Sequence, residues 1–205
     1  MDFALSVLLA FTVWHILRTR YQRERIALLA QHLSGLKLEQ YMETLTEGYT
    51  RAIREKDESR QLQVLDTYTQ TESALAAQLR SLAAEMLKED PQRYGMGVLR
   101  FCVPYVERFM PGITRDFRKL VRVHASGLRS VVDNDAGWDA KTRAYHLSAE
   151  LFLFQHSCHW FCKSRGVADA RLMLRHQVTH QKVLESVSPV TRKGYLQWVQ
   201  SAAAS

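Results

Sequence analysis

The sequence FALSVLLAFTVWHIL, residues 3–17, is a run of 15 residues without a formally charged side chain at neutral pH. It is followed at once by RTRYQRER, residues 18–25, in which four arginines stand against one glutamate. An apolar segment with a basic segment on its C-terminal side is the pattern of a membrane anchor whose C-terminal side stays in the cytoplasm. This stretch therefore decides the architecture that the sequence predicts.

The apolar run is short for a membrane span. Its 15 residues would rise about 22 Å as an α-helix, whereas the hydrocarbon core of a bilayer is about 30 Å thick. The deficit shrinks if the span takes in residues 1–21, with two arginines extending their guanidinium groups towards the headgroups and a tyrosine lying among them. We therefore expect Arg18, Arg20 and Tyr21 to be the membrane-interface anchors.

Other interpretations of the segment fit less well. A cleaved signal peptide would have a basic start and a small-x-small cleavage site, but this chain begins with Asp2 and has arginines where cleavage would occur. A buried core helix usually has a shorter apolar run, of about 10 to 14 residues. An interfacial helix needs a polar face, which residues 3–17 lack. We expect a single spanning helix.

The rest of the chain is long enough for one domain. About 180 residues follow the anchor and can bury a sizeable core. The expected division is residues 1–25 for the anchor and its basic segment, and residues 26–205 for a cytoplasmic domain. The three cysteines have no disulfide-framework spacing, which agrees with a reducing compartment. Arginine clearly outnumbers lysine, which is typical of a GC-rich genome. The expected location is the bacterial inner membrane, with the N-terminus outside because the basic segment follows the apolar run.

The pattern predicts an all-α fold: the transmembrane helix, which runs on to Gly35, followed by a bundle of about six to seven helices. No segment shows sustained alternation of apolar and polar residues, and glycines and prolines occur at intervals suited to helix boundaries. The expected helices cover residues 36–56, 59–89, 114–132 (with Thr114 as N-cap), 139–164, 168–187 and a short stretch that begins at Ser188-Pro189. Residues 98–113 are aromatic-rich and interrupted by Pro104, so they form a kinked helix or turns that either pack in the core or touch the bilayer.

The C-terminal third gathers possible metal ligands, since five of the eight histidines lie between residues 146 and 180. If helices 139–164 and 168–187 form a hairpin about Gly166, His156 would face His176, and imidazoles on facing helices can hold a transition metal. The candidate ligands are His156, His159, Cys162, His176 and His180. Residues 176–180, HQVTH, lack the glutamate of a zinc-protease motif, and no C-x-x-C pair is present. We expect no cofactor and keep a transition metal as the alternative.

A basic stripe follows helical spacing in the middle of the chain and consists of Arg115, Arg118, Lys119, Arg122 and Arg129. The segment that contains the stripe, residues 115–129, and the basic segment 18–25 together account for the net charge of +7. Three interpretations stay open: a solvated face, a contact with anionic lipid, and a contact with nucleic acid. Basic residues confined to two short segments fit an anionic membrane surface better than they fit nucleic acid.

No catalytic motif occurs in the sequence: there is no G-x-S-x-G, no phosphate-binding glycine loop and no dinucleotide fingerprint. Glu150 lies in an apolar stretch one turn from His146, and we expect a buried structural hydrogen bond there rather than an acid–base couple. The sequence favours a membrane-anchored helical module that scaffolds or recruits a protein partner, and it leans away from an enzyme. The alternatives are a metal-binding enzyme or sensor built on the C-terminal hairpin, and a nucleic-acid-binding protein.

Overall fold

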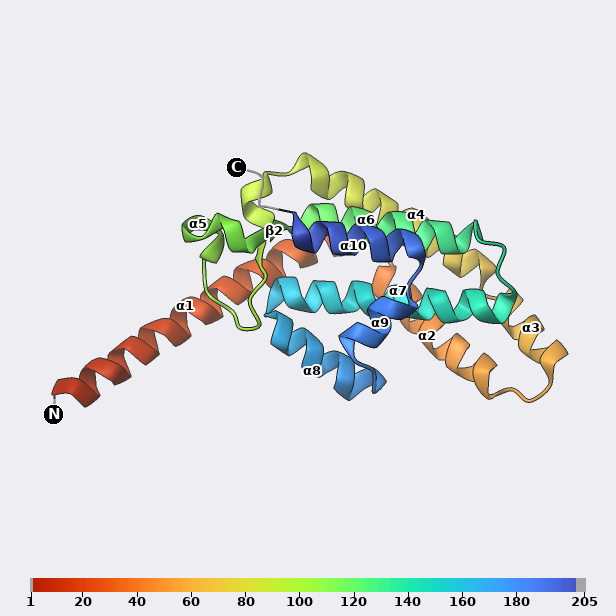
Figure 1. Ribbon diagram of the computed structural model, residues 1–205, viewed down its shortest axis with the longest axis horizontal. Helices are drawn as coiled ribbons and strands as arrows, with labels where there is room; N and C mark the ends of the chain where they lie inside the picture. Colours follow the sequence, from red (N-terminus) through yellow and green to blue (C-terminus); the bar gives the residue numbers. More distant parts are fainter. Residues whose placement is uncertain (1, 202–205) are drawn as a thin grey trace.

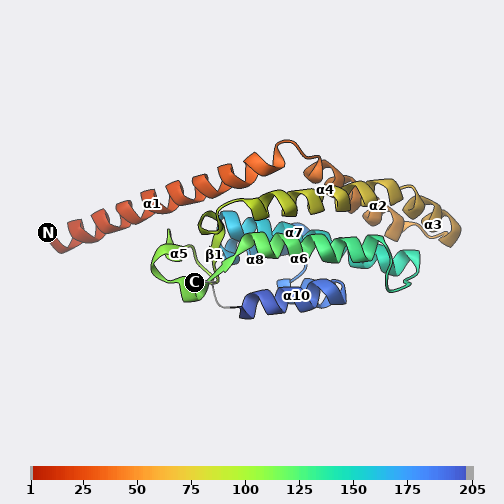
Figure 2. The same ribbon diagram turned by 90° about the horizontal axis from the view of Figure 1, so that it is seen from above.

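The computed structural model describes residues 2–201 and shows an all-α protein with one small sheet. The N-terminal half of helix α1 (Asp2–Leu33) projects from the body, and its C-terminal half packs against it (Figures 1 and 2). The other helices are α2 (Leu38–Arg54), α3 (Glu58–Asp66), α4 (Thr69–Lys88), α5 (Val106–Phe109), α6 (Phe117–Val132), α7 (Ala140–Cys162), α8 (Arg165–His176), α9 (His180–Ser186) and α10 (Pro189–Gln200). Two 3-10 turns, η1 (Pro91–Tyr94) and η2 (Pro111–Ile113), flank the strands β1 (Gly95–Gly97) and β2 (Thr114–Asp116), which pair antiparallel.

Helix α1 is continuous because the sequence holds no glycine or proline before Gly35. Residues 3–17 of this helix are exposed: Phe3 is 84% exposed and Phe11 is 64% exposed. One face of its second half is buried, where Tyr21 is 7% exposed and Leu29 is 5% exposed. The stretch Phe3–Leu33 contains a window that is long and apolar enough to cross a membrane. The expected long apolar N-terminal helix is therefore present, and it enters the core of the body without a linker.

The core of the body is built around α6, which lies between α4 and α10 and also packs on α7 (Figure 2). The apolar face that the sequence predicts for this helix is buried, and it consists of Phe117, Leu120, Val121, Leu128 and Val131. On the side towards α10, a Cβ atom at Gly127 would lie 1.5 Å from Thr191 Oγ1. Glycine is therefore what allows α6 and α10 to approach so closely.

The body contains more helices than the six to seven expected, because nine follow α1 within residues 2–201. The predicted helix 59–89 breaks between α3 and α4, and the predicted helix 168–187 breaks between α8 and α9. At the second break Gln177 takes a left-handed conformation with φ 54°, and Thr179 then caps α9. A single turn of helix, α5, accounts for part of the segment 98–113.

Two helix boundaries also differ from the prediction. Helix α6 begins at Phe117, not at residue 114, because Thr114 belongs to β2 and the N-cap is Asp116, whose carboxylate accepts from Arg118 N at 2.9 Å. The hairpin does not turn at Gly166, because Ser164 is the N-cap of α8 and Gly166 lies within that helix. The predicted start of α10 is confirmed, with Ser188 as N-cap and proline in the first turn.

Candidate functional site

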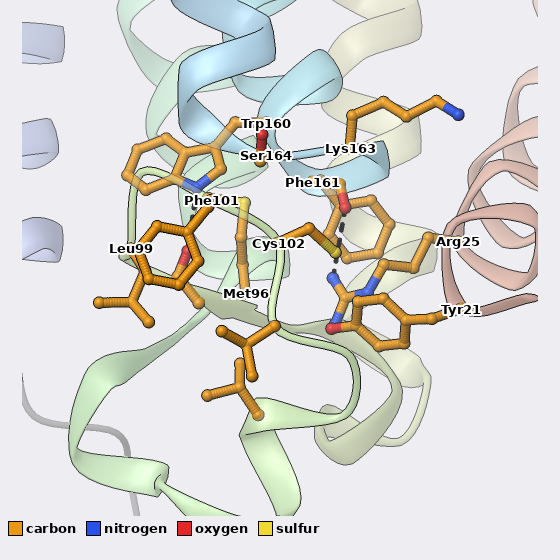
Figure 3. A pocket seen from close by; sticks show the side chains of 13 residues that line it. Tyr21, Arg25, Met96, Leu99, Phe101, Cys102, Trp160, Phe161, Lys163 and Ser164 are labelled. Carbon is orange, nitrogen blue, oxygen red and sulfur yellow. Dashed lines mark hydrogen bonds between the residues drawn. The ribbon is translucent and has the colours of Figure 1, made fainter. Parts of the chain in front are cut away.

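The part of α1 that joins the body is organised by Arg25, whose side chain is 6% exposed (Figure 3). Its guanidinium group lies 4.4 Å from the ring centroid of Tyr21 and 4.6 Å from that of Phe161. It forms an ion pair with Glu107 at 3.5 Å and donates to the carbonyl oxygens of Phe161 and Gly95. A buried cation with this set of partners ties α1 to α5, β1 and the end of α7.

Two tyrosines connect the same turn of α1 to α5. The hydroxyl of Tyr21 donates to Glu107 Oε2 at 2.8 Å, and the hydroxyl of Tyr105 donates to Glu24 Oε2 at 3.2 Å. The rings of Tyr21 and Tyr105 meet edge to face, with centroids 4.9 Å apart. We call Tyr21, Arg25, Tyr105, Glu107 and Phe161 the anchor base.

The expected interface anchors have different environments. Arg20 is largely exposed and forms an ion pair with Glu24 at 3.0 Å, and Arg18 is half-buried. Tyr21 differs from the prediction because it is buried against protein and its hydroxyl is bonded to Glu107. The helical spacing of Tyr21, Arg25, Leu28 and Leu29 places them on one face, and this was the signal that could have identified Arg25 as a core residue.

The basic stripe is not one uniform solvated face. Arg115 lies in β2, where its guanidinium group donates to the carbonyl oxygens of Val199 at 2.9 Å and Gly112 at 3.0 Å. Arg118 is 8% exposed and forms an ion pair with Asp116 at 2.8 Å. Both side chains therefore serve the packing of the body.

The remaining members of the stripe are more accessible. Lys119 and Arg122 are exposed on α6, and Arg129 forms an ion pair with Asp133 in the last turn. A charge reversal of the whole stripe would therefore break the hydrogen bonds of Arg115 and the ion pair of Arg118, in addition to changing the charge of the exposed face of α6.

The histidine-rich region brings His156 to His180, not to His176. The ring centroids of His156 and His180 are 4.5 Å apart. His156 Nε2 lies 2.8 Å from Asp169 Oδ1, and His180 Nε2 lies 2.9 Å from the hydroxyl of Tyr195. Burial, together with the neighbouring His156, lowers the pKa of His180 to about 4, so His180 is neutral at neutral pH.

The other candidate ligands have separate partners. His159 Nδ1 lies 2.9 Å from an Arg171 nitrogen, and burial lowers the pKa of His159 to about 4. His176 stacks on Phe152 with centroids 3.9 Å apart. Burial raises the pKa of the Cys162 thiol to about 11. Within residues 2–201, no group of three or more histidine, cysteine, aspartate or glutamate side chains is arranged to hold a metal ion.

A groove of about 360 Å³ lies between α7 and α8. We call it the α7–α8 groove, and its lining includes His159, Arg171, Leu174, Arg175 and His176. Leu174 is 84% exposed and lies close in sequence to Arg171 and Arg175 on α8. The groove therefore offers an apolar contact flanked by positive charge.

Glu150 is buried as expected, but its partner is not His146. Its carboxylate accepts from Ser188 N at 2.9 Å, Ser188 Oγ at 2.7 Å and Thr191 Oγ1 at 2.7 Å. Burial raises the pKa of Glu150 to about 7, although these hydrogen bonds act in the opposite direction. His146 instead contacts the carbonyl oxygen of Ser186 at 2.8 Å. The carboxylate thus fastens the start of α10 to α7.

A buried serine–histidine pair does not form a nucleophilic site. Ser157 Oγ lies 2.9 Å from His124 Nε2, but both residues are at most 1% exposed, and burial lowers the pKa of His124 to about 3. Ser157 also donates to the carbonyl oxygen of Leu153. A substrate has no access to this hydroxyl, so the pair serves packing.

No protein-family model, curated protein or solved structure matches this chain. The fold defines an all-α protein whose N-terminal helix is long and apolar enough to span a membrane. The features of the molecule that bear on its function are the anchor base and the exposed surfaces of the body.

Proposed function

We propose that this protein is a single-pass membrane protein that recruits a protein partner to the cytoplasmic surface of the bacterial inner membrane. The observation that carries the proposal is α1, whose exposed apolar half continues directly into a half that is part of the core. Arg18, Arg20 and Arg23 follow the apolar run, and the positive-inside rule places them, and the body with them, in the cytoplasm. The body is then held at a fixed height above the bilayer.

The α7–α8 groove is the surface that best suits a partner. Leu174 supplies an exposed apolar contact, and Arg171 and Arg175 supply positive charge on the same helix. A helix or extended segment of a partner with acidic residues around an apolar anchor matches this combination, since basic clusters and apolar anchors are recurring modes of peptide recognition. The proposed occupant is therefore an acidic, amphipathic protein segment.

Affinity capture from detergent-solubilised membranes tests the recruitment function. We expect the full-length protein to recover a partner, and the double variant Arg171→Glu, Arg175→Glu to recover it about tenfold less well, since ~1.4 kcal/mol of binding energy is a factor of ten. The matched control is Arg192→Glu, Lys193→Glu, which reverses two exposed charges on α10.

Equal recovery by the groove variant would contradict the groove as the partner surface, and the absence of any specific partner would contradict recruitment. Metal analysis of the same sample separates recruitment from the metal-binding alternative. Near-stoichiometric zinc or iron that is lost in His156→Ala would favour that alternative.

A further inference from the structure

The exposed half of α1 fixes the height of the bilayer relative to the body. The apolar run ends at Leu17, and Tyr21 is already packed in the body. Four residues of helix rise about 6 Å, so little more than one turn separates the end of the run from the body. If α1 spans the membrane, as the proposed function requires, every part of the body that is level with Tyr21 lies at the membrane surface.

The segment 99–112 lies at this level, and we call it the membrane-proximal loop. Figures 1 and 2 both show α5 and its flanking chain at the end of the body nearest the exposed half of α1. The bonds from Tyr21 to Glu107 and from Tyr105 to Glu24 hold α5 against the first turns of α1 beyond the apolar run. The height of the loop is thus set by the anchor base.

The loop contains both buried and exposed apolar side chains. Cys102 and Val106 are buried, at 8% and 4%. Phe101, Phe109 and Met110 are exposed, at 66%, 79% and 53%. Leaving three large apolar side chains in water on one short loop is unfavourable, so a surface that covers them would stabilise the loop.

The charges of the loop indicate which surface covers it. Arg100 and Arg108 are exposed and stand directly beside Phe101 and Phe109 in the sequence. The one acidic residue of the loop, Glu107, is already bound by Arg25 and Tyr21. Aromatic rings with adjacent arginines match the interfacial region of a bilayer, where rings lie at headgroup level and guanidinium groups meet phosphates.

We propose that Phe101, Phe109 and Met110 insert into the interfacial region of the same bilayer that α1 spans. The proposed occupant is lipid, because the loop lies at the end of the body nearest the exposed half of α1 and carries the exposed Arg100 and Arg108, which an anionic leaflet attracts. One helix alone leaves the body free to rotate about its axis, whereas a second contact fixes its tilt and rotation. The membrane-proximal loop therefore sets the direction in which the α7–α8 groove faces.

Depth-dependent quenching in reconstituted vesicles tests this contact on the full-length chain. Phe109→Cys is labelled with an environment-sensitive fluorophore, and its quenching by a nitroxide near the lipid headgroup is compared with quenching by aqueous iodide. We expect strong nitroxide quenching and about threefold less iodide quenching than at a water-exposed position, since interfacial rings lie at headgroup level.

Ile53→Cys is the matched control, because Ile53 is also an exposed apolar residue, at 63%, and lies on α2 far from the membrane-proximal loop (Figure 1). The control should be quenched by iodide and not by the lipid nitroxide. The labelled parent protein measures the background from the native cysteines, of which Cys162 has a pKa raised to about 11 by burial.

A third label separates the failure of this inference from the failure of the proposed function. Leu9→Cys lies within the apolar run and should be quenched by a nitroxide deep in the acyl chains. If Leu9 is quenched and Phe109 is open to iodide, α1 spans the membrane and the loop contact is refuted. If Leu9 is not quenched, the span itself is refuted. Protection of Phe109 from both quenchers would show a protein contact, such as a second copy, and would also overturn the inference.

Discussion

Replacing Arg25 with methionine is expected to lower the free energy of unfolding by about 3–5 kcal/mol, because breaking a buried ion pair leaves its partners unpaired. Methionine fills a similar volume, but Glu107 would lose its cation, and the carbonyl oxygens of Gly95 and Phe161 would lose a donor. In a chain of about 200 residues this corresponds to a fall in the melting temperature of roughly 10 °C. Thermal unfolding of the full-length protein in detergent, followed by circular dichroism, measures it.

Arg20→Met is the matched control for this prediction. Arg20 lies on the same helix and also forms an ion pair, but its side chain is 74% exposed. Exposed ion pairs of this kind contribute at most about 1 kcal/mol. An equal effect of the two substitutions would show that Arg25 does not hold α1 against the body.

Replacing Glu150 with glutamine is expected to change how stability depends on pH. Burial raises the pKa of Glu150 to about 7 in the folded protein, from 4.5. Below pH 4.5 the carboxyl is protonated in both states and contributes no pH dependence. As the pH rises from 4.5 to 7, the unfolded state loses this proton first, so the parent protein loses up to about 3 kcal/mol of stability, after which the effect is constant.

Glutamine stays neutral, so Glu150→Gln should become more stable relative to the parent across this window. Its amide oxygen can still accept from Ser188, and its amide nitrogen can donate to Thr191. The measurement is the difference in unfolding free energy between the two proteins from pH 4.5 to 8, which cancels the contributions of the histidines. Glu185→Gln, on the exposed face of α9, is the control and should follow the parent. A constant difference between Glu150→Gln and the parent would contradict the buried, protonatable carboxyl.

The sequence predicts those features that depend on local pattern. The continuity of α1 follows from the absence of glycine and proline before Gly35, and the buried face of α6 follows from its 3.6-residue period. The cap of α10 at Ser188 follows from the serine–proline pair. These features need no knowledge of what packs against them.

The features that the sequence does not predict depend on tertiary contacts. Arg25 belongs to a cluster of arginines that suggests a solvated segment, and although its helical spacing with Tyr21 and Leu29 indicates the buried face, its partners Phe161 and Glu107 come from distant parts of the chain. The histidine that meets His156 depends on where the helix after the hairpin turn ends. Because the chain reverses at Gln177, α9 brings His180 to His156, whereas a single straight helix would have brought His176. The loop 99–112 has no periodicity from which its inner and outer faces could be read.

Extraction of membranes with alkaline carbonate tests the central claim, that the exposed half of α1 spans the bilayer. The comparison is between the full-length chain and a variant that lacks residues 2–17. In this variant Met1 is followed directly by Arg18, so Tyr21 and Arg25, which are part of the body, are kept. We predict that the full-length protein stays in the membrane pellet and that the shortened protein is soluble and helical. Release of the intact full-length protein by carbonate would contradict a spanning helix.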